Sequence, residues 1–333
     1  MAKSWQQSLL SSGLPLENDV RTYLESKGCI ADFEYSYLKP DELTIERQFS
    51  YDIDASYIRR RNFVDLMVEC KYRYPGTRWV FTPDHYGGPE EFGQNAFMHP
   101  FDHFVPHKFP FPGNFPRELA PACSKAVELL PDGPNEKTVV QALNQLAYAI
   151  APKIVSAIDH QINRLLVQDH IFYHVPVIAT TAELFRLNDG VRIQQIRDAN
   201  DLEEVATRQS CLVMSYKPGV ELSRYNAKVI NSIAALVDQK ALKKCLNSFT
   251  NDLGHLLSVI STTYCPRAVV FVTVDSRQSG FEQLFAYIDD LFEPPTCLLA
   301  DLEKQQNELV ELLDGLPDIR LRQPKPRSKK TAK

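Results

Sequence analysis

Acidic side chains and a lysine recur in one short stretch of the chain with the types and spacing to bind a divalent cation. Asp52 and Asp54 are two positions apart, and Glu69 and Lys71 follow after a basic turn. Carboxylates that are brought together repel one another, and a divalent cation is the usual way to hold them. Because no histidine or cysteine cage accompanies these oxygen ligands, they favour Mg²⁺ or Mn²⁺ over Zn²⁺.

Two strands are expected to position these side chains, because residues 44–57 and 63–74 both alternate between apolar and polar types. The apolar face consists of Phe49, Tyr51, Ile53, Ala55, Val64, Leu66, Val68 and Cys70. The opposite face carries Asp52, Asp54, Asp65, Glu69 and Lys71. A polar turn at 59–62 joins the strands, so the hairpin should bring all the acids to one face within about 10 Å. The same residues also fit the solvated face of an edge hairpin with cross-strand ion pairs.

A helix is expected before the strands. It begins at Ser12 or Gly13, has Pro15 in its first turn and stops at Gly28. Glu17 lies in the first turn, where the helix dipole favours a negative charge. Its side chain is either a favourable first-turn acid or a contact to a metal ion or water.

Asp52, followed in the next strand by Glu69-Cys70-Lys71, resembles the PD-(D/E)XK nuclease superfamily, which has the restriction-endonuclease-like fold. That superfamily places an acid on one strand and acid-x-lysine on the next, often after a glutamate on the first helix. The run 13–73 is similar throughout to uncharacterised bacterial members. The chain departs from the family pattern at Tyr51, which stands where the proline would be, and this leaves open whether Asp52 or Asp54 binds the metal.

The resemblance implies a metal-dependent nuclease that hydrolyses phosphodiester bonds, a DNA endonuclease of restriction or antiviral defence type. Asp52, Glu69 and the Cys70 carbonyl would bind Mg²⁺, with Mn²⁺ as a substitute. Lys71 would orient water or stabilise the phosphate, and Glu17 would contact a second metal or a water. Families of this type also often carry a polar residue near the metal site on the next helix, where this chain has Gln141 and Gln145. The alternative role of these glutamines is that of exposed helix formers.

A binding protein is the competing class: a nuclease fold without catalysis that acts as a nucleic-acid-binding or assembly component. The charge distribution suits it, since the net charge is −5 while the C-terminal residues 320–333 are basic, which leaves an acidic body. The intact set of Glu17, Asp52, Glu69 and Lys71 argues against it. Basic residues expected to contact nucleic acid near the site are Arg59, Arg60, Arg61 and Arg73, with Arg47 and Arg78 close by in sequence. Their alternative role is to keep the hairpin soluble.

Residues 82–117 are rich in proline and phenylalanine and lack periodicity, which is typical of an insertion packed over a domain as a lid or an oligomer contact. The segment contains His99, His103 and His107, whose spacing raises a zinc-dependent hydrolase as a third class. Pro100 and Pro106 disfavour the helix that this spacing would need, and no nearby cysteine completes a tetrahedral site. The chain's seven cysteines are scattered without a CxxC pair, so we expect them to be reduced.

The predicted fold is α/β with a mixed sheet: a restriction-endonuclease-like core over 1–190, an α/β extension over 191–316 packed on it, and a disordered basic tail over 317–333. Within the core, residues 1–12 are expected to be weakly ordered, 135–168 to form a long helix and 174–187 one buried strand. Beyond it, helices are expected over 198–206, over 221–263 with a split near 238–240, and over 280–292 and 299–313, and strands over 211–216 and 268–274.

No apolar stretch approaches the roughly 18 residues of a membrane span, and no signal-peptide core follows Met1, so a cytoplasmic location without a membrane partner is expected. The expected partner is nucleic acid, with DNA as the first choice. A homo-oligomer and a partner protein that licenses cutting both stay open.

Overall fold

The computed structural model describes residues 4–40, 46–84, 97–108, 117–130, 133–135, 137–163, 169–248, 250–275, 277–300, 303, 304 and 307. The chain divides into two compact units, Met1–Phe292 and Glu293–Lys333. The elements discussed below all belong to the first unit. Within the described residues, no helix has the length and apolar character needed to cross a membrane.

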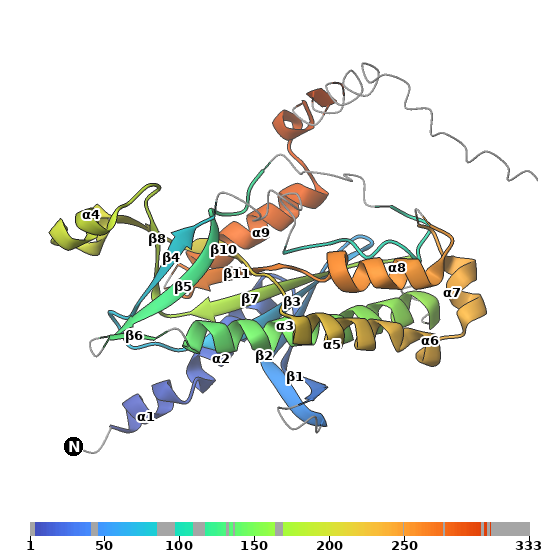
Figure 1. Ribbon diagram of the computed structural model, residues 1–333, viewed down its shortest axis with the longest axis horizontal. Coiled ribbons are helices and arrows are strands. Elements are labelled where there is room, and N and C mark those ends of the chain that lie inside the picture. Colours follow the sequence, from blue (N-terminus) through green and yellow to red (C-terminus); the bar gives the residue numbers. More distant parts are fainter. Residues whose placement is uncertain are drawn as a thin grey trace, which may run out of the picture. The chain divides into compact units, whose positions relative to one another are not determined.

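The first unit is built on one mixed sheet of eleven described strands (Figure 1). Their order across the sheet is β1-β2-β3-β7-β11-β10-β5-β4-β8-β9, and β6 pairs with β5. The strands are β1 (Ile30–Pro40), β2 (Glu46–Arg59), β3 (Asn62–Lys71), β4 (Arg78–Pro83), β5 (Ala122–Leu130), β6 (Gly133–Asn135), β7 (Ile171–Thr180), β8 (Glu183–Leu187), β9 (Ala206–Gln209), β10 (Cys211–Ser215) and β11 (Ala268–Thr273). The predicted α/β class with a mixed sheet is confirmed.

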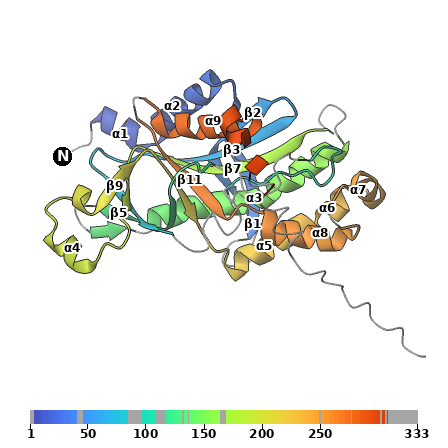
Figure 2. The same cartoon turned by 90° about the horizontal axis from the view of Figure 1, so that it is seen from above.

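Helices cover both faces of this sheet. Figure 2 shows α2 and α9 on one side and α3, α5 and α8 on the other, with the strands between them. The described α-helices are α1 (Trp5–Ser11), α2 (Leu14–Ser26), α3 (Lys137–Asn163), α4 (Ile193–Asp198), α5 (Val220–Asn231), α6 (Ile233–Leu236), α7 (Gln239–Cys245), α8 (Leu253–Val259) and α9 (Ser279–Phe292).

The elements around the predicted site follow the order α2, β1, β2, β3, α3, β7. Strands β1, β2 and β3 form an antiparallel meander, and β7 then pairs with β3 in parallel. A parallel partner requires a long crossover, and α3 lies in that crossover. All ten residues of β7 are buried, because the strand has neighbours on both edges and helices on both faces. Membership of the superfamily that the chain resembles remains a prediction.

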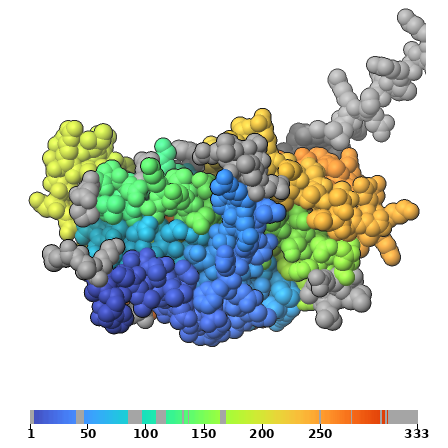
Figure 3. Space-filling view, turned by 90° about the horizontal axis from the view of Figure 1, so that it is seen from below, coloured from blue at the N-terminus to red at the C-terminus, as the bar shows by residue number. Residues whose placement is uncertain are grey.

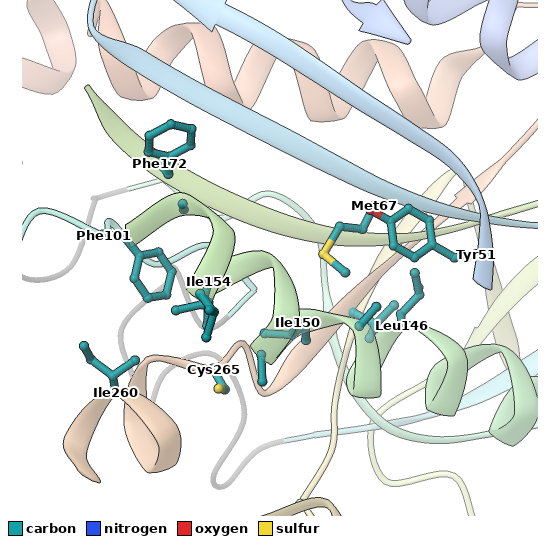
Figure 4. Packing of buried hydrophobic residues seen from close by; sticks show 14 of the residues in the cluster. Tyr51, Met67, Phe101, Leu146, Ile150, Ile154, Phe172, Ile260 and Cys265 are labelled. Carbon is teal, nitrogen blue, oxygen red and sulfur yellow. The ribbon is translucent and has the colours of Figure 1, made fainter. Parts of the chain in front are cut away.

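The main core lies between α3 and the sheet. Leu146, Ile150 and Ile154 face the strands from α3, and Tyr51 and Met67 meet them from β2 and β3 (Figure 4). All five side chains are fully buried. Because Tyr51 and Met67 belong to the same hairpin as Asp52 and Glu69, this packing fixes the hairpin against the helix.

Several predicted boundaries are wrong. Residues 1–12 are not weakly ordered throughout, since Ser4 and Gln7 form a capping box that starts α1. The single strand predicted over 174–187 is two strands, β7 and β8, because the chain turns at Thr181. There Thr181 accepts the Arg73 N–H at 2.7 Å and donates to the Arg73 carbonyl at 2.8 Å, so it bonds with another segment rather than extending the strand.

The helices predicted beyond β8 also differ from the observed ones. Only a short 3₁₀ turn, Leu202–Glu204, lies inside the helix predicted over 198–206, and α4 ends at Asp198, where that helix would begin. The split predicted near 238–240 is confirmed, since α6 ends at Leu236 and α7 begins at Gln239. Further breaks, which were not predicted, separate α5 from α6 and α7 from α8, and a π-helical turn follows at Ile260–Tyr264. Asp238 and Asp252 each cap the helix that follows them, so these breaks are helix starts that polar side chains specify.

The predicted insertion is described in part. Its residues 97–108 pack onto the sheet, with Phe101 bridging to Phe172 of β7 and Phe104 buried. Residues 85–96 and 109–116, most of the helix predicted over 299–313 and the predicted basic tail over 317–333 lie outside the described residues. The boundary predicted at 190 stays a prediction; strands β10 and β11, which follow it, pair within the same sheet as β7.

A buried charge network ties α3 to the hairpin. Lys153 of α3 lies 2.9 Å from Asp54 Oδ2 and 3.6 Å from Asp65 Oδ2. His174 Nδ1 lies 3.3 Å from Asp65, and Ser56 donates to Asp65 at 2.7 Å. Burial alone would raise the pKa of Asp65, but His174 and Lys153 outweigh it and hold that pKa below its ordinary value. Lys153 is therefore the counter-ion of an aspartate on each of two strands, Asp54 on β2 and Asp65 on β3.

Replacing Lys153 should test how strongly this network holds the fold. We expect Lys153→Ala to lower the free energy of unfolding by about 3–5 kcal/mol, because the buried Asp65 and the partly buried Asp54 lose their counter-ion. Urea titration followed by circular dichroism measures the change. Lys125→Ala, at an exposed position of β5, is the matched control and should stay within about 0.5 kcal/mol. Adding Asp54→Asn and Asp65→Asn should recover part of the loss; equal stability of Lys153→Ala and wild type would contradict the argument.

Candidate active site

Asp52 lies where the β2–β3 ladder ends. The regular pairing runs from Arg59–Asn62 at the turn to Ile53–Val68. At the next residue, the Asp52 side chain takes the place of a backbone carbonyl as hydrogen-bond acceptor: its carboxylate accepts the Cys70 N–H at 2.7 Å. In an antiparallel ladder the N–H and C=O of one residue point to the same side. The Cys70 carbonyl therefore faces the side of the sheet edge where Asp52 lies, as the metal-ligand prediction requires.

An irregularity on the other side of β2 marks the same position. The β1–β2 register pairs Phe33 with Ile53 and Tyr35 with Tyr51, and Glu34 between them has a φ of 59°. A left-handed backbone is uncommon for a residue other than glycine and marks a local break in the strand. Asp52, opposite this break, is thus freed from regular pairing on both of its edges, which lets its side chain turn toward β3.

Glu69 and Lys71 project from the same face of β3 toward α3. The Lys71 ammonium forms an ion pair with Glu69 Oε1 and lies 3.4 Å from Gln145 Oε1 of α3. Thr180 of β7 donates to the Lys71 carbonyl at 2.8 Å and so fixes the backbone there. The Glu69 side chain is 1% exposed, and its Oε2 atom is buried without a hydrogen-bond partner in the described structure.

The acids of the predicted set influence one another electrostatically. Burial, followed by the charge of Asp52, raises the pKa of Glu69 to about 8. Burial also raises the pKa of Asp52, and burial and the charge of Asp52 raise the pKa of Glu17. The positive charge of Lys71 opposes each of these three increases in pKa without cancelling it. The structure therefore brings Glu17, Asp52, Glu69 and Lys71 into one electrostatic cluster.

The residues present fit a magnesium ion held by few protein ligands. Among the described residues, no group of three or more His, Cys, Asp or Glu side chains is placed to hold a metal. Mg²⁺ is commonly bound through one or two carboxylates, with waters and substrate phosphates completing its octahedron. The buried oxygen of Glu69, the Asp52 carboxylate and the Cys70 carbonyl supply ligands of that kind.

Asp54 and Asp65 do not join the cluster, so the forecast of four acids in one group is wrong. Tyr51 donates to Asp54 at 2.8 Å, and Lys153 binds Asp54 and lies near Asp65. The two acids therefore belong to the charge network under α3. The predicted alternation also breaks here, because Tyr51, expected on the face opposite Asp54, packs with Met67 against α3 on the side where Asp54 lies.

The turn arginines lie far from the cluster. A strand rises about 3.3 Å per residue, which puts Arg61 roughly 25 Å from Glu69 along β3. Arg59 contacts Tyr57 and lies 3.4 Å from Asp289 of α9, and Arg61 contacts His107. The expectation that these residues, with Arg60, form a rim close to the metal site is wrong in position. Their contact with nucleic acid stays a prediction.

Arg73 lies at the correct end of β3 but faces a structural partner. Its guanidinium forms an ion pair with Glu128 of β5, whose side chain is 2% exposed. The Glu128 carboxylate also accepts from Trp79 and Asn135. Arg73 is thus the counter-ion of a buried acid, and its predicted contact with nucleic acid would have to use the part of the guanidinium left outside this pair.

Two of the insertion's histidines, His99 and His103, pack against the ring of Tyr264, and the third, His107, lies elsewhere. Burial lowers the pKa of His99 and of His103 to about 4. His103 packs edge-on against Tyr264, while His107 contacts Arg61. The described residues contain no site that would gather these side chains around a metal ion. Nothing in this geometry favours the zinc-dependent hydrolase.

Sequence reasoning missed Lys153 and His174. A signal for Lys153 was present, since it follows Ile150 by three positions on the apolar face of α3, where a lysine needs a buried counter-ion. Gln145 was noted, with Gln141, at a position where the resembled families carry a polar residue near the metal site, and its contacts with Lys71 and with the Ser50 carbonyl at 3.3 Å come from the fold.

Comparison of the chain with protein-family models, curated proteins and solved structures finds no match. The function proposed below therefore depends on the geometry and chemistry of the chain's own residues.

The raised pKa of Glu69 predicts a stability that falls with pH. In metal-free buffer, the folded protein keeps a proton on Glu69 that the unfolded chain releases above about pH 4.5. Wild type should therefore lose up to about 1.4 kcal/mol per pH unit through this group until pH reaches about 8. Glu69→Gln lacks this slope, so the variant should gain on wild type from pH 5 to pH 9, as measured by denaturant unfolding.

The control for this measurement is Glu282→Gln. Hydrogen bonds from Lys27 and Tyr23 lower the pKa of Glu282, so its charged form is favoured in the fold. That variant should not gain stability relative to wild type as pH rises. If Glu69→Gln and Glu282→Gln track each other across the range, burial does not hold Glu69 protonated.

Proposed function

We propose that the chain is a metal-dependent nuclease that hydrolyses phosphodiester bonds in DNA, of the restriction-endonuclease-like type. One observation carries the proposal: Glu69 presents a buried side-chain oxygen without a hydrogen-bond partner in the described structure, close to Asp52 and in contact with Lys71. A buried carboxylate oxygen left unpaired is costly in a structure that serves only stability. It is the atom that a divalent cation would satisfy.

Asp52, Glu69 and the Cys70 carbonyl are the groups that would hold Mg²⁺ or Mn²⁺. When bound, such an ion supplies a Lewis acid for the phosphate and lowers the pKa of a coordinated water. The hydrogen bond from the Cys70 N–H fixes one oxygen of Asp52, which leaves the other for a ligand. Both carboxylates have raised pKa values, so they are ready to gain from a cation that stabilises their charged forms.

Lys71 and Gln145 position and stabilise the reacting phosphate in this proposal. The Lys71 side chain is 21% exposed, whereas that of its partner Glu69 is almost fully buried, so the lysine extends from the buried acid toward solvent. It carries donors for a phosphate oxygen or an attacking water. Gln145 lies 3.4 Å from it and is itself anchored to the Ser50 carbonyl, which limits where the ammonium can go.

Glu17 is the outermost acid of the cluster. It lies in the first turn of α2, which follows the left-handed Gly13, and its backbone N–H bonds to the Gly13 carbonyl. A side chain at Gly13 would meet Glu17 Oε1 at 3.0 Å, so the glycine leaves room for the carboxylate. Glu17 is suited to hold a water or a second metal ion at the edge of the site.

Removing single members of the cluster should abolish cleavage without unfolding the chain. We expect Glu69→Ala and Lys71→Ala each to lower the cleavage rate of plasmid and of single-stranded DNA by at least about 10²-fold, since each removes a ligand or a charged donor at the reacting phosphate. The assay uses Mg²⁺ and Mn²⁺ in parallel, with circular dichroism as the folding control. Undiminished activity of Glu69→Ala would refute the catalytic assignment and favour the binding-protein alternative.

Asp52 and Asp54 form a matched pair for locating the metal ligand. Asp52→Asn should lose activity far more than Asp54→Asn, because Asp54 is bound to Lys153 and Tyr51 rather than to the cluster. Rates are compared at a temperature where both variants are folded. The reverse ranking would move the metal to Asp54.

Metal binding should raise the melting temperature. A ligand that binds only the folded state stabilises it by about 2.7 kcal/mol at one hundred times its dissociation constant. Mg²⁺ and Mn²⁺ should both shift the thermal transition, and Ca²⁺ should shift it while supporting little cleavage. Differential scanning calorimetry of wild type, Glu69→Ala and Asp54→Asn measures this. The shift should vanish in Glu69→Ala and persist in Asp54→Asn; no shift in wild type would remove the metal from the proposal.

A further inference from the structure

A lysine held between two aromatic rings lies beside the candidate active site. Lys39 Nζ is 3.9 Å from the ring centroid of Tyr148 and 4.7 Å from that of Phe49. Phe49 in turn stacks on Tyr37 at 6.2 Å, and Tyr148 packs on Tyr225 at 5.1 Å. The three residues Lys39, Phe49 and Tyr148, here called the aromatic–lysine patch, are all partly exposed.

The aromatic–lysine patch shares its supports with Gln145. Tyr148 follows Gln145 by three positions on α3, so both side chains lie on the same face of the helix. Phe49 precedes Ser50 of β2, whose carbonyl accepts from Gln145, and the Tyr37 hydroxyl donates to the Gln145 carbonyl at 2.7 Å. The aromatic–lysine patch is therefore continuous with the side chain that contacts Lys71.

Lys39 differs from the partly buried lysines of the network and the active site. Lys71 and Lys153 each have a carboxylate partner, whereas Lys39 forms no ion pair within the described part of the chain. Burial lowers its pKa, and the charge of Glu221 opposes that shift without an ion pair. Ring faces are a weak substitute for an anion, so this ammonium would gain from a phosphate.

Figure 3 shows that this part of the chain reaches the surface. The blue surface of β1 and β2 lies between the green of the β5 and α3 segments and the yellow-orange of α5. The contact with α5 is direct, since Tyr225 donates to the Leu38 carbonyl at 2.8 Å. Residues from three elements thus hold the aromatic–lysine patch rigidly around the end of β1.

We infer that the aromatic–lysine patch binds a single strand of DNA next to the phosphate that Asp52, Glu69 and Lys71 would cleave. In this inference Lys39 leaves the rings to contact a neighbouring phosphate, and a base stacks on Phe49 or Tyr148. The inference rests on the proposed function for the location of the scissile bond. It adds the class of substrate, because the phosphate backbone alone would not need exposed rings.

Stacking distinguishes a single strand from a duplex. The bases of a duplex are already stacked and paired, and their faces are closed to a protein ring unless the helix is opened. An unpaired base exposes its face to any aromatic side chain, with little regard to sequence. The combination of a cation and aromatic rings is the arrangement that single-strand binding proteins use. The acidic body of the chain would also oppose a long duplex.

The test measures binding without cleavage. The full chain in EDTA is titrated into a fluorescein-labelled oligothymidylate, its abasic counterpart and a duplex of equal length, with fluorescence anisotropy as the readout. Wild type should bind the single strand at least tenfold more tightly than the abasic strand or the duplex. Phe49→Ala and Tyr148→Ala should each weaken single-strand binding by about 5- to 100-fold. Phe49→Tyr and Tyr148→Phe keep the rings and should retain it.

Lys39→Met should flatten the salt dependence of binding, because this variant neutralises one phosphate fewer than wild type. The slope of log affinity against log salt should fall by about 0.7. Lys27→Met is the matched control, since Lys27 also lies over two rings, those of Tyr23 and Phe285, but on the face of the sheet that α2 and α9 cover. Lys27→Met should leave both the affinity for the single strand and its salt dependence unchanged. Thermal melts confirm that each variant is folded.

The outcomes separate this inference from the proposed function. Ring-dependent binding of the single strand in a chain that never cleaves DNA would support the inference and refute the nuclease. Normal cleavage by a chain whose Phe49→Ala and Tyr148→Ala variants bind like wild type would overturn the inference and leave the nuclease standing. Equal affinity for single strand, abasic strand and duplex would also overturn the inference.

Discussion

The contact of the buried Lys153 with the carboxylates of Asp54 and Asp65 is the constraint on which the rest of the site depends. It links α3 to β2 through Asp54 and to β3 through Asp65, so the helix cannot slide along the hairpin without leaving a charge uncompensated. Apolar packing around Leu146 alone would tolerate small shifts. Because Gln145 and Tyr148 belong to the same helix, the charge network sets their distance from Lys71 and Lys39.

The hairpin therefore carries two pairs of acids that differ in how completely the fold supplies them with hydrogen-bond and ion-pair partners. Asp54 and Asp65 share a lysine, a histidine and two hydroxyl donors, which satisfy them inside the fold. Asp52 and Glu69 share Lys71, and one Glu69 oxygen is left without a partner. Similar side chains on neighbouring positions of the same strands are thus structural in one place and, in the proposed function, reactive in the other. The difference is set by what α3 presents to each pair.

Sequence alternation predicted the β2–β3 hairpin and its acidic side chains, because the period of two is a local property that each strand satisfies by itself. It did not predict that Asp54 would separate from Asp52, since that depends on Lys153, which is distant in sequence. The position of Arg61 was misjudged because nearness in sequence was taken for nearness to Glu69, although an extended strand separates them. The break at Thr181 was missed for a similar reason: its hydroxyl bonds with Arg73, in a segment that lies far away along the chain.

The central location of β7 in the sheet determines when the candidate site forms during folding. Thr180 and Lys71, whose hydrogen bond fixes the backbone beside Glu69, are 109 residues apart in sequence. Pairing over such a separation closes a long loop and comes late in folding. A nascent chain that has left the ribosome only as far as β3 lacks both α3 and β7, so it has the acids and the lysine but nothing to hold them in place. During synthesis the site is therefore unformed, and it is assembled only when the sheet is closed.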